Sequence, residues 1–172
     1  MPWRDLPTFF STLHQWPGPD ARALEFLLLT CCPRTGEIIP AVWSEIDGDK
    51  WHVPASHMKS GEGRTIPLNP AAIALLAGIK PDDATPRNLI FGSRRRGGTG
   101  RQTEDAMQVL LREKLRLDYT VHGFRSSFMD WVAEAHPDRP LHVRHPLLAP
   151  VQIRSKIAAM PCPPPMHIVT RA

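Results

Sequence analysis

The chain has 172 residues, a length that suits a single domain with a hydrophobic core. Its longest apolar run, Phe26 to Cys32, is too short to cross a bilayer, and its N-terminus lacks the basic and apolar stretches of a secretory signal. We therefore predict a cytoplasmic protein without membrane segments. The net charge of +4 permits an anionic partner but does not require one.

Cysteine usage argues against two classes of site. The chain contains Cys31, Cys32 and Cys162, and two of these are adjacent. This spacing fits neither a disulfide framework nor a zinc site. We predict no metal ligands, and we expect the adjacent pair to end a buried helix as small apolar residues.

Helices are predicted at the start of the chain. The first covers Leu6 to Trp16. The second covers Ala21 to Cys32, with Asp20 as its N-cap and a proline directly after its end. A third, short helix follows Arg34 and runs through Glu37.

A β-rich stretch comes next. Val42 to Ile46 and Lys50 to Val53 flank a glycine-bearing turn, which is typical of a hairpin. Ala55 to Lys59 and Arg64 to Leu68 flank a second turn of this kind and predict a second hairpin.

The following part is predicted to be mainly helical. Asn69 is the expected N-cap of a helix over Pro70 to Ala77, with proline at its first position. A further helix is predicted from Thr103 to Leu115, with Ala106, Met107, Val109 and Leu110 facing inward. The last helix covers Val121 to Ala135, with Thr120 as its cap.

Between these helices lie a predicted short strand, Asn88 to Phe91, and a glycine-rich basic loop. The loop contains Arg94, Arg95 and Arg96. Such a run has two interpretations, a solvated surface loop or a contact with DNA phosphates. We also predict that three tryptophan side chains pack in the core between the sheet and the helices, those of Trp43, Trp51 and Trp131.

The composition changes near His136. The segment 136–172 is rich in proline and almost free of acidic residues, and proline at this density prevents helices and disfavours central strands. We expect a domain over residues 1–135 followed by a poorly ordered, proline-rich tail. The abrupt change suggests a reading-frame change or a truncated gene.

A few residues have the chemistry that phosphodiester transfer requires. Arginines bind phosphate oxygens with two hydrogen bonds and stay charged, lysine protonates a leaving oxygen, and histidine moves protons near neutral pH. Taken singly, each such residue has an ordinary interpretation as a solvated surface or helix-end side chain. The candidates are Arg34, Glu37, Lys59, His122 and Arg125.

In their order and spacing, the segments TCCPRTGEI, SHMKSGEGRTIPL and TVHGFRSSF resemble successive blocks of a tyrosine recombinase (phage-integrase family) catalytic domain. The similarity covers Pro2 to Ala135 and is closest to prophage and genomic-island integrases. It implies an α+β fold, mainly helical with a small antiparallel sheet near its basic face. It also implies a double-stranded DNA partner, a mobile element as source, and no metal or nucleotide cofactor.

The resemblance implies a role for each candidate. Arg34 and Arg125 would clamp the scissile phosphate, Lys59 would be the general acid, and His122 would assist in proton transfer. Glu37 matches the acidic position beside the first arginine and would hold an active-site cation.

The sequence departs from the family at the nucleophile. The family's third basic box should fall where Pro146 to Pro150 lies, and its tyrosine should follow that box. Here Tyr119 is the single tyrosine and precedes His122, and nothing marks Ser126 or Ser127 as activated. We therefore expect no strand exchange by this chain alone.

There are three alternatives to the interpretation of this chain as a recombinase domain that only binds DNA. The chain is a DNA-binding or partner-binding remnant that interferes with an intact integrase, or an unstable remnant without a role. A complete enzyme requires a partner chain that supplies the tyrosine in trans.

Overall fold

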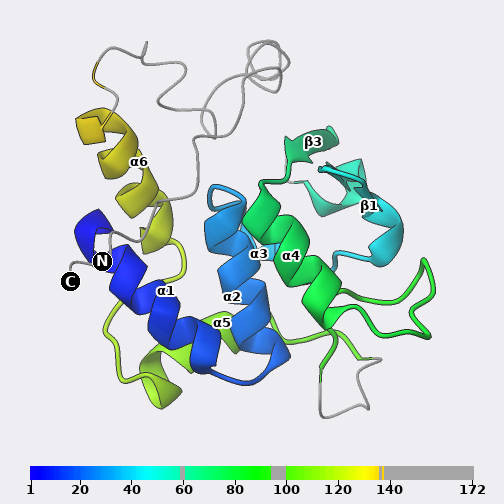
Figure 1. The fold of residues 1–172 in the computed structure, drawn as a ribbon, viewed down its shortest axis with the longest axis horizontal. Coiled ribbons are helices and arrows are strands. Elements are labelled where there is room, and N and C mark those ends of the chain that lie inside the picture. The colour runs from blue at the N-terminus through cyan, green and yellow to red at the C-terminus, as the bar shows by residue number, and fades with distance from the viewer. Residues whose placement is uncertain (59–60, 94–99, 136, 138–172) are drawn as a thin grey trace.

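The computed structural model describes residues 1–58, 61–93, 100–135 and 137. These residues form a mainly helical α+β domain with a small antiparallel sheet, as predicted. Helix α2 (Pro19–Leu29) lies at the centre, between α1 (Leu6–Gln15) and α4 (Pro70–Ile79), and the sheet lies beyond α4 (Figure 1). Apart from residue 137, the predicted tail lies outside the described residues.

The central helix α2 begins earlier than predicted and ends earlier too. Gly18 is its N-cap with φ 139°, a conformation that favours glycine, and Pro19 takes the first helical position. The prediction of Asp20 as N-cap was therefore wrong, since Asp20 lies within the first turn. After Leu29 the chain leaves the helix through Cys31 and Cys32, which have left-handed φ values of 61° and 56°.

The sheet has three antiparallel strands in the order β1 (Ile46–Asp47), β2 (Lys50–Val53) and β3 (Arg64–Pro67). Trp51 pairs with Ile46 of β1 on one side and with Ile66 of β3 on the other, so β2 is the central strand. Residues on β2 alternate between exposed and buried, and this places Trp51 and Val53 in the core.

Three strand predictions were wrong. Ala55 to Lys59 does not form the first strand of a second hairpin: Ala55–His57 is a 3₁₀ turn, and β2 itself pairs with β3. In the first predicted strand, Trp43–Glu45 forms a second 3₁₀ turn, leaving only Ile46 in β1. The predicted strand Asn88 to Phe91 is reduced to an isolated bridge between Leu89 and Val42.

Helix α4 is capped as predicted. Asn69 Oδ1 accepts a hydrogen bond from the main-chain N–H of Ala72 at 2.8 Å. Asn69 Nδ2 donates to the carbonyl oxygen of Leu29 at 2.8 Å. One side chain therefore joins the start of α4 to the end of α2.

The predicted helix from Thr103 to Leu115 has two parts, α5 (Ala106–Val109) and the π-helical turn η5 (Leu110–Lys114). Val109 is 37% exposed, so its predicted inward orientation was wrong. Met107 and Leu110 are buried as expected.

The described residues include three further helical elements. They are η1 (Trp3–Asp5), α3 (Thr35–Ile38) and α6 (Gly123–Ala135), of which α3 and α6 are labelled in Figure 1. Thr120 caps α6 as predicted, since its Oγ1 accepts from the Gly123 N–H at 3.0 Å.

Aromatic side chains make up much of the core. The Phe26 ring contacts Trp51 and Phe91, with ring centroids 5.2 and 5.4 Å apart. Phe124 stacks on Phe9 at 5.3 Å, which holds α6 against α1. Trp131 differs from the prediction, because it is half-buried on α6 rather than packed on the sheet.

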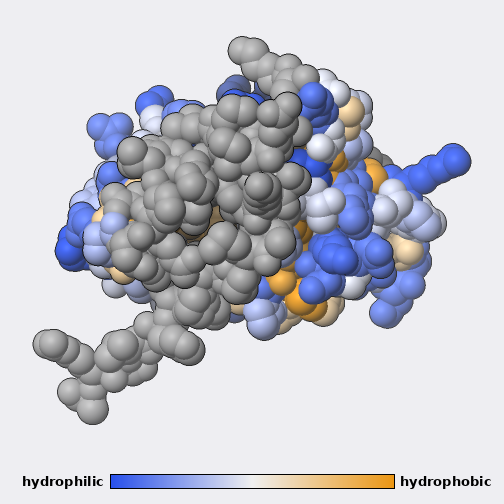
Figure 2. Space-filling view, turned by 90° about the horizontal axis from the view of Figure 1, so that it is seen from above, coloured by the Kyte–Doolittle hydropathy of each residue, from blue (hydrophilic) through white to orange (hydrophobic). Residues whose placement is uncertain are grey.

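The surface seen from above is mostly hydrophilic where it is coloured, with smaller hydrophobic areas (Figure 2). Ile73 and Val109 are large hydrophobic residues with 38% and 37% exposure. Single exposed residues of this kind are normal on soluble domains. Within the described ranges, no helix is long and apolar enough to span a membrane.

Candidate functional site

Arg34 is exposed at the start of α3. It is the N-cap residue, with extended backbone angles of φ −76° and ψ 150°. Its main-chain carbonyl accepts hydrogen bonds from Glu37 and Ile38, while its side chain extends from the turn that follows Cys32. The short helix therefore fixes the backbone on which this arginine stands.

Glu37 is one helical turn away and is buried. Its side chain is 3% exposed, and it forms an ion pair with Arg64, whose side chain is 16% exposed. Glu37 was predicted to hold an active-site cation, and Arg64 was not among the predicted site residues. The ion-pair partner of Glu37 thus comes from β3, a separate part of the chain.

Arg125 lies in the first turn of α6 and contacts the same region. Its Nη1 donates to the main-chain carbonyl oxygen of Cys32 at 2.7 Å. Burial is the main cause that lowers the pKa of the Arg125 guanidinium, and the positive charges of Arg34 and Arg64 lower this pKa as well. Cys32 and Glu37 act in the opposite direction and raise it. The structure thus brings together Arg34, Glu37, Arg64 and Arg125 from α3, β3 and α6.

His122 lies directly before α6 rather than within it, because the helix begins at Gly123 and not at Val121 as predicted. The His122 main-chain carbonyl accepts from the Arg125 N–H at 3.1 Å. Its side chain is exposed. The two residues therefore lie within one turn of each other at the start of α6.

Comparison with known proteins decides the family. The phage integrase family model matches residues 5–141. This chain belongs to the phage integrase family. A region of 107 residues, 61% of the chain, is 33% identical to Prophage integrase IntA of Escherichia coli strain K12 and spans 26% of that relative. No solved structure matches the chain.

Four predicted site residues of this phage integrase domain lie outside the described residues: Lys59, Arg94, Arg95 and Arg96. The structure describes what flanks Lys59. The Gly61 N–H donates to the Met58 carbonyl oxygen at 3.0 Å. Gly63 lies against β2, where an added Cβ would come within 2.9 Å of the Val53 carbonyl oxygen.

The hydroxyl groups near the integrase site do not show the arrangement of an activated nucleophile. Ser127 is buried, and its Oγ donates to the carbonyl oxygens of Met1 and Gly123. Ser126 is exposed. Tyr119 is half-buried, and its main-chain carbonyl accepts from Gln108 Nε2 at 3.0 Å.

The thiol of Cys32 contributes to structure. Its Sγ lies 3.5 Å from the Phe124 carbonyl oxygen, and burial raises its pKa to about 12. A thiol with this pKa stays protonated and is a poor nucleophile and a poor metal ligand. Within the described ranges, no cluster of histidine, cysteine and acidic side chains is suited to a metal ion.

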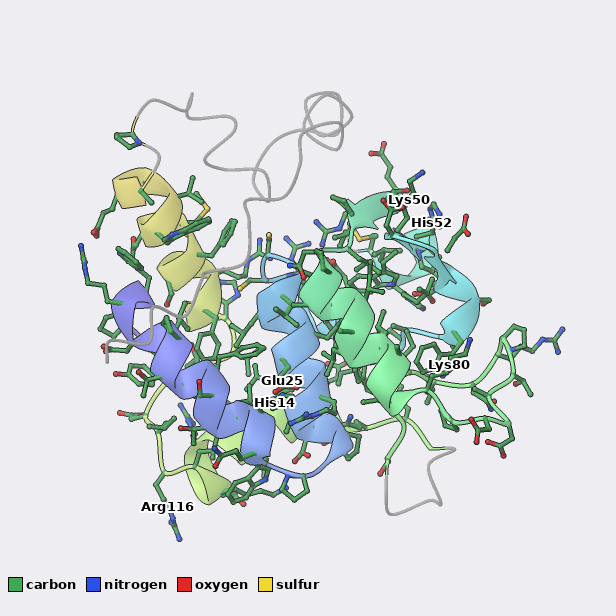
Figure 3. All side chains as sticks on the ribbon, in the orientation of Figure 1. His14, Glu25, Lys50, His52, Lys80 and Arg116 are labelled. Atoms are coloured by element: carbon green, nitrogen blue, oxygen red, sulfur yellow. The ribbon has the colours of Figure 1, made fainter. Side chains whose placement is uncertain are left out.

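Two buried carboxylates lie away from the arginine cluster. Glu25 is fully buried in α2, and its Oε1 lies 3.0 Å from His14 Nδ1 of α1 (Figure 3). Glu45 accepts from Trp51 Nε1 at 2.9 Å and lies 3.6 Å from His57 Nδ1. Burial is the main cause that raises the pKa of both acids.

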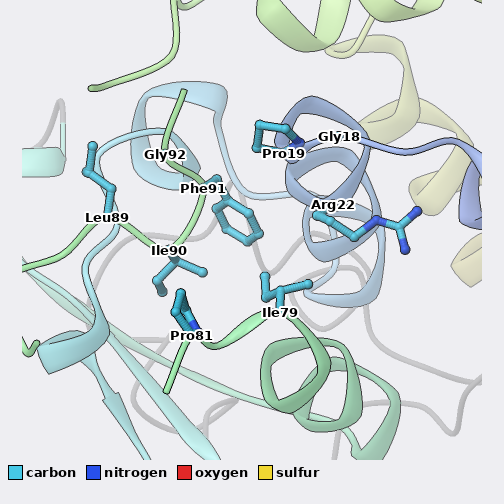
Figure 4. A pocket seen from close by; sticks show the side chains of 9 residues that line it. All are labelled: Gly18, Pro19, Arg22, Ile79, Pro81, Leu89, Ile90, Phe91 and Gly92. Carbon is cyan, nitrogen blue, oxygen red and sulfur yellow. The ribbon is translucent and has the colours of Figure 1, made fainter. Parts of the chain in front are cut away.

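A cavity of about 290 Å³ lies between the first turn of α2 and the last turn of α4 (Figure 4). Its lining is largely apolar, including Ile79, Leu89 and Phe91, with Arg22 at one side. Arg22 Nη2 donates to main-chain carbonyl oxygens in the last turn of α1 and to that of Trp16, directly after the helix. The cavity is therefore at the end of α2 opposite the arginine cluster, and the candidate site residues do not line it.

Proposed function

We propose that this phage integrase domain binds duplex DNA through its backbone phosphates. Arg34 and Arg125 hold one phosphate, in the roles that the family resemblance implies. The convergence of their charges beside Glu37 supports this proposal, because two guanidinium groups from separate elements are suited to grip one phosphate from two sides.

The proposal gives two further residues roles in DNA cleavage by a complete site. Lys59 would protonate the departing 5′ oxygen, and His122 would assist in proton transfer at the phosphate. Both roles come from the resemblance. The position of His122 beside the first turn of α6 is compatible with its role, since the N-terminus of a helix favours an anion.

We further propose that these 172 residues do not cut DNA alone. The covalent step requires a nucleophile that attacks phosphorus in line with the leaving oxygen, and cations do not replace it. The single tyrosine, Tyr119, is in the segment whose main chain is bonded to Gln108. A partner chain that supplies a tyrosine would complete the reaction.

DNA binding across a salt series tests the proposal. The wild-type chain and an Arg34→Ala/Arg125→Ala variant are compared by fluorescence anisotropy with a labelled duplex. Wild-type affinity should fall steeply with salt, and the double variant should bind at least tenfold more weakly, with a shallower salt slope. Arg116→Ala is the control, because this exposed arginine lies far from the cluster (Figure 3). Equal binding by the wild type and the double variant would contradict the proposal.

The second candidate is a domain that interferes with an intact integrase. Two observations together favour it. The chain has an arginine cluster, and its single tyrosine, Tyr119, precedes Arg125. Adding the chain to a recombination reaction of a related integrase should then reduce product in proportion to its concentration. The Arg34→Ala/Arg125→Ala variant should inhibit less if competition for DNA is the cause.

A further inference from the structure

Three arginines lie near one buried carboxylate in this domain. Arg64 of β3 forms an ion pair with Glu37 of α3, and the charges of Glu37, Arg34 and Arg64 all act on Arg125 of α6. We propose that Arg64 is a third phosphate ligand of the site and that Glu37 fixes its guanidinium there. This inference rests on the proposed function, because it concerns the same phosphate.

The ion pair determines where the Arg64 guanidinium lies. Glu37 is 3% exposed and is anchored in α3, so its carboxylate is a fixed point. Arg64 keeps 16% exposure, which leaves part of its side chain accessible from solvent. A guanidinium has five N–H donors in a planar fork and can bind a carboxylate on one edge and a phosphate on another.

The charge balance of the cluster calls for an anion. Three guanidinium groups and one carboxylate leave a net charge of +2 on these four side chains. Like charges held together in a partly buried place repel one another, and both Arg34 and Arg64 act in this way on Arg125. A DNA phosphate brought to this place would relieve that repulsion and would meet all three arginines.

The competing explanation is that Arg64 serves Glu37 alone. In that case Arg64 would only neutralise a buried acid, and DNA binding would not depend on it. Replacing Arg64 alone does not distinguish the two explanations, because it leaves Glu37 buried without its partner and disturbs the fold. The Glu37→Gln/Arg64→Gln variant avoids this problem by removing both charges.

This double variant has a second advantage. It removes one negative and one positive charge, so the net charge of the protein is unchanged. Long-range attraction to DNA therefore stays the same, and any change in the salt slope reports a lost phosphate contact. Arg116→Gln is the matched control, since it lowers the net charge by one at an exposed position away from the cluster.

The experiment measures the affinity of the full chain for a labelled duplex between about 50 and 200 mM salt. Loss of one phosphate contact should reduce the slope of log affinity against log salt by about 0.9. We expect this reduction for Glu37→Gln/Arg64→Gln and a smaller one for Arg116→Gln. Urea unfolding of each variant verifies that the fold is retained.

The outcomes separate the two proposals. If Arg34→Ala/Arg125→Ala loses binding while Glu37→Gln/Arg64→Gln keeps the wild-type slope, the proposed function stands and the role of Arg64 is overturned. If the wild type shows no salt-dependent binding, both are overturned. If both double variants lose slope, Arg64 is a phosphate ligand.

Discussion

Arg125 donates a hydrogen bond from Nη1 to the main-chain carbonyl oxygen of Cys32 at 2.7 Å, although the two residues are 93 positions apart. The bond joins the first turn of α6 to the turn that follows α2. Cys32 has a φ of 56°, and this left-handed conformation sets the direction of its carbonyl. The geometry of the arginine cluster thus depends on a turn that lacks glycine.

The Cys31 position should prefer glycine over alanine. Cys31 has a φ of 61°, a conformation that costs residues with a Cβ about 1–2 kcal/mol. We expect Cys31→Gly to be more stable than Cys31→Ala by about 1 kcal/mol in urea unfolding, the reverse of the order found within helices. A more stable alanine variant would contradict the left-handed turn.

Gly63 should not tolerate a side chain. An added Cβ would lie 2.9 Å from the Val53 carbonyl oxygen and 3.3 Å from the Ala55 nitrogen, both main-chain atoms. Gly63→Ala should therefore lower the free energy of unfolding by about 1–3 kcal/mol. Gly36→Ala is the matched control, because an added Cβ there meets no atom within 4 Å. Equal unfolding midpoints for the two variants would show that β2 and β3 are farther apart.

Asn69 should matter for two contacts at once. Asn69→Ala removes the cap of α4 and the bond to the Leu29 carbonyl, which together are worth about 1–3 kcal/mol. Asn69→Ser keeps a capping oxygen and loses only the bond to Leu29, so its effect on the free energy of unfolding should be smaller. Urea unfolding of the pair measures the difference, and equal losses would mean that the cap contributes little.

Glu25 should make the domain less stable as pH rises. Burial raises the pKa of this acid, against the opposing effects of Arg22 and His14, so the folded state holds the proton more strongly than the unfolded chain. Its contribution to stability is complete below the unfolded value, about 4.3, and is lost as pH rises through the folded value. Glu25→Gln should therefore flatten the fall in unfolding free energy between about pH 4 and neutral.

The control for this prediction is Glu104→Gln, because the Glu104 side chain is 77% exposed. It should follow the wild-type pH dependence. A Glu25→Gln variant that also follows the wild type would show that the ion pair with Arg22, at 3.1 Å, offsets the burial of the acid.

Local signals predicted the helices better than the strands. Asn69 before Pro70 and Thr120 before α6 act through contacts within one turn, so the sequence is enough to place them. Strand pairing depends on distant partners. Ala55 to Lys59 is close to β3 along the chain, yet β2 pairs with β3 because Trp51 and Val53 bury their side chains in the core.

The candidate site likewise contains residues that local sequence motifs predicted and one that depends on a distant partner. The family motifs named Arg34, Glu37 and Arg125, and the structure places these three together. Arg64 belongs to the same cluster but was not singled out, because its significance comes from an ion pair across separate elements. A lone arginine on a predicted strand carries no signal of that pairing, whereas a buried acid without a local partner could have prompted the search.

Strand β3 borders the sheet, and among the described residues it pairs only with β2. An open strand edge can recruit strands from other molecules and start aggregation. Here the last residue of β3 is Pro67, which has no N–H to offer a newcomer, and its first is the charged Arg64. Pro67 therefore limits strand addition at this edge, and a variant that replaces it with a residue that has an N–H should be more prone to self-association.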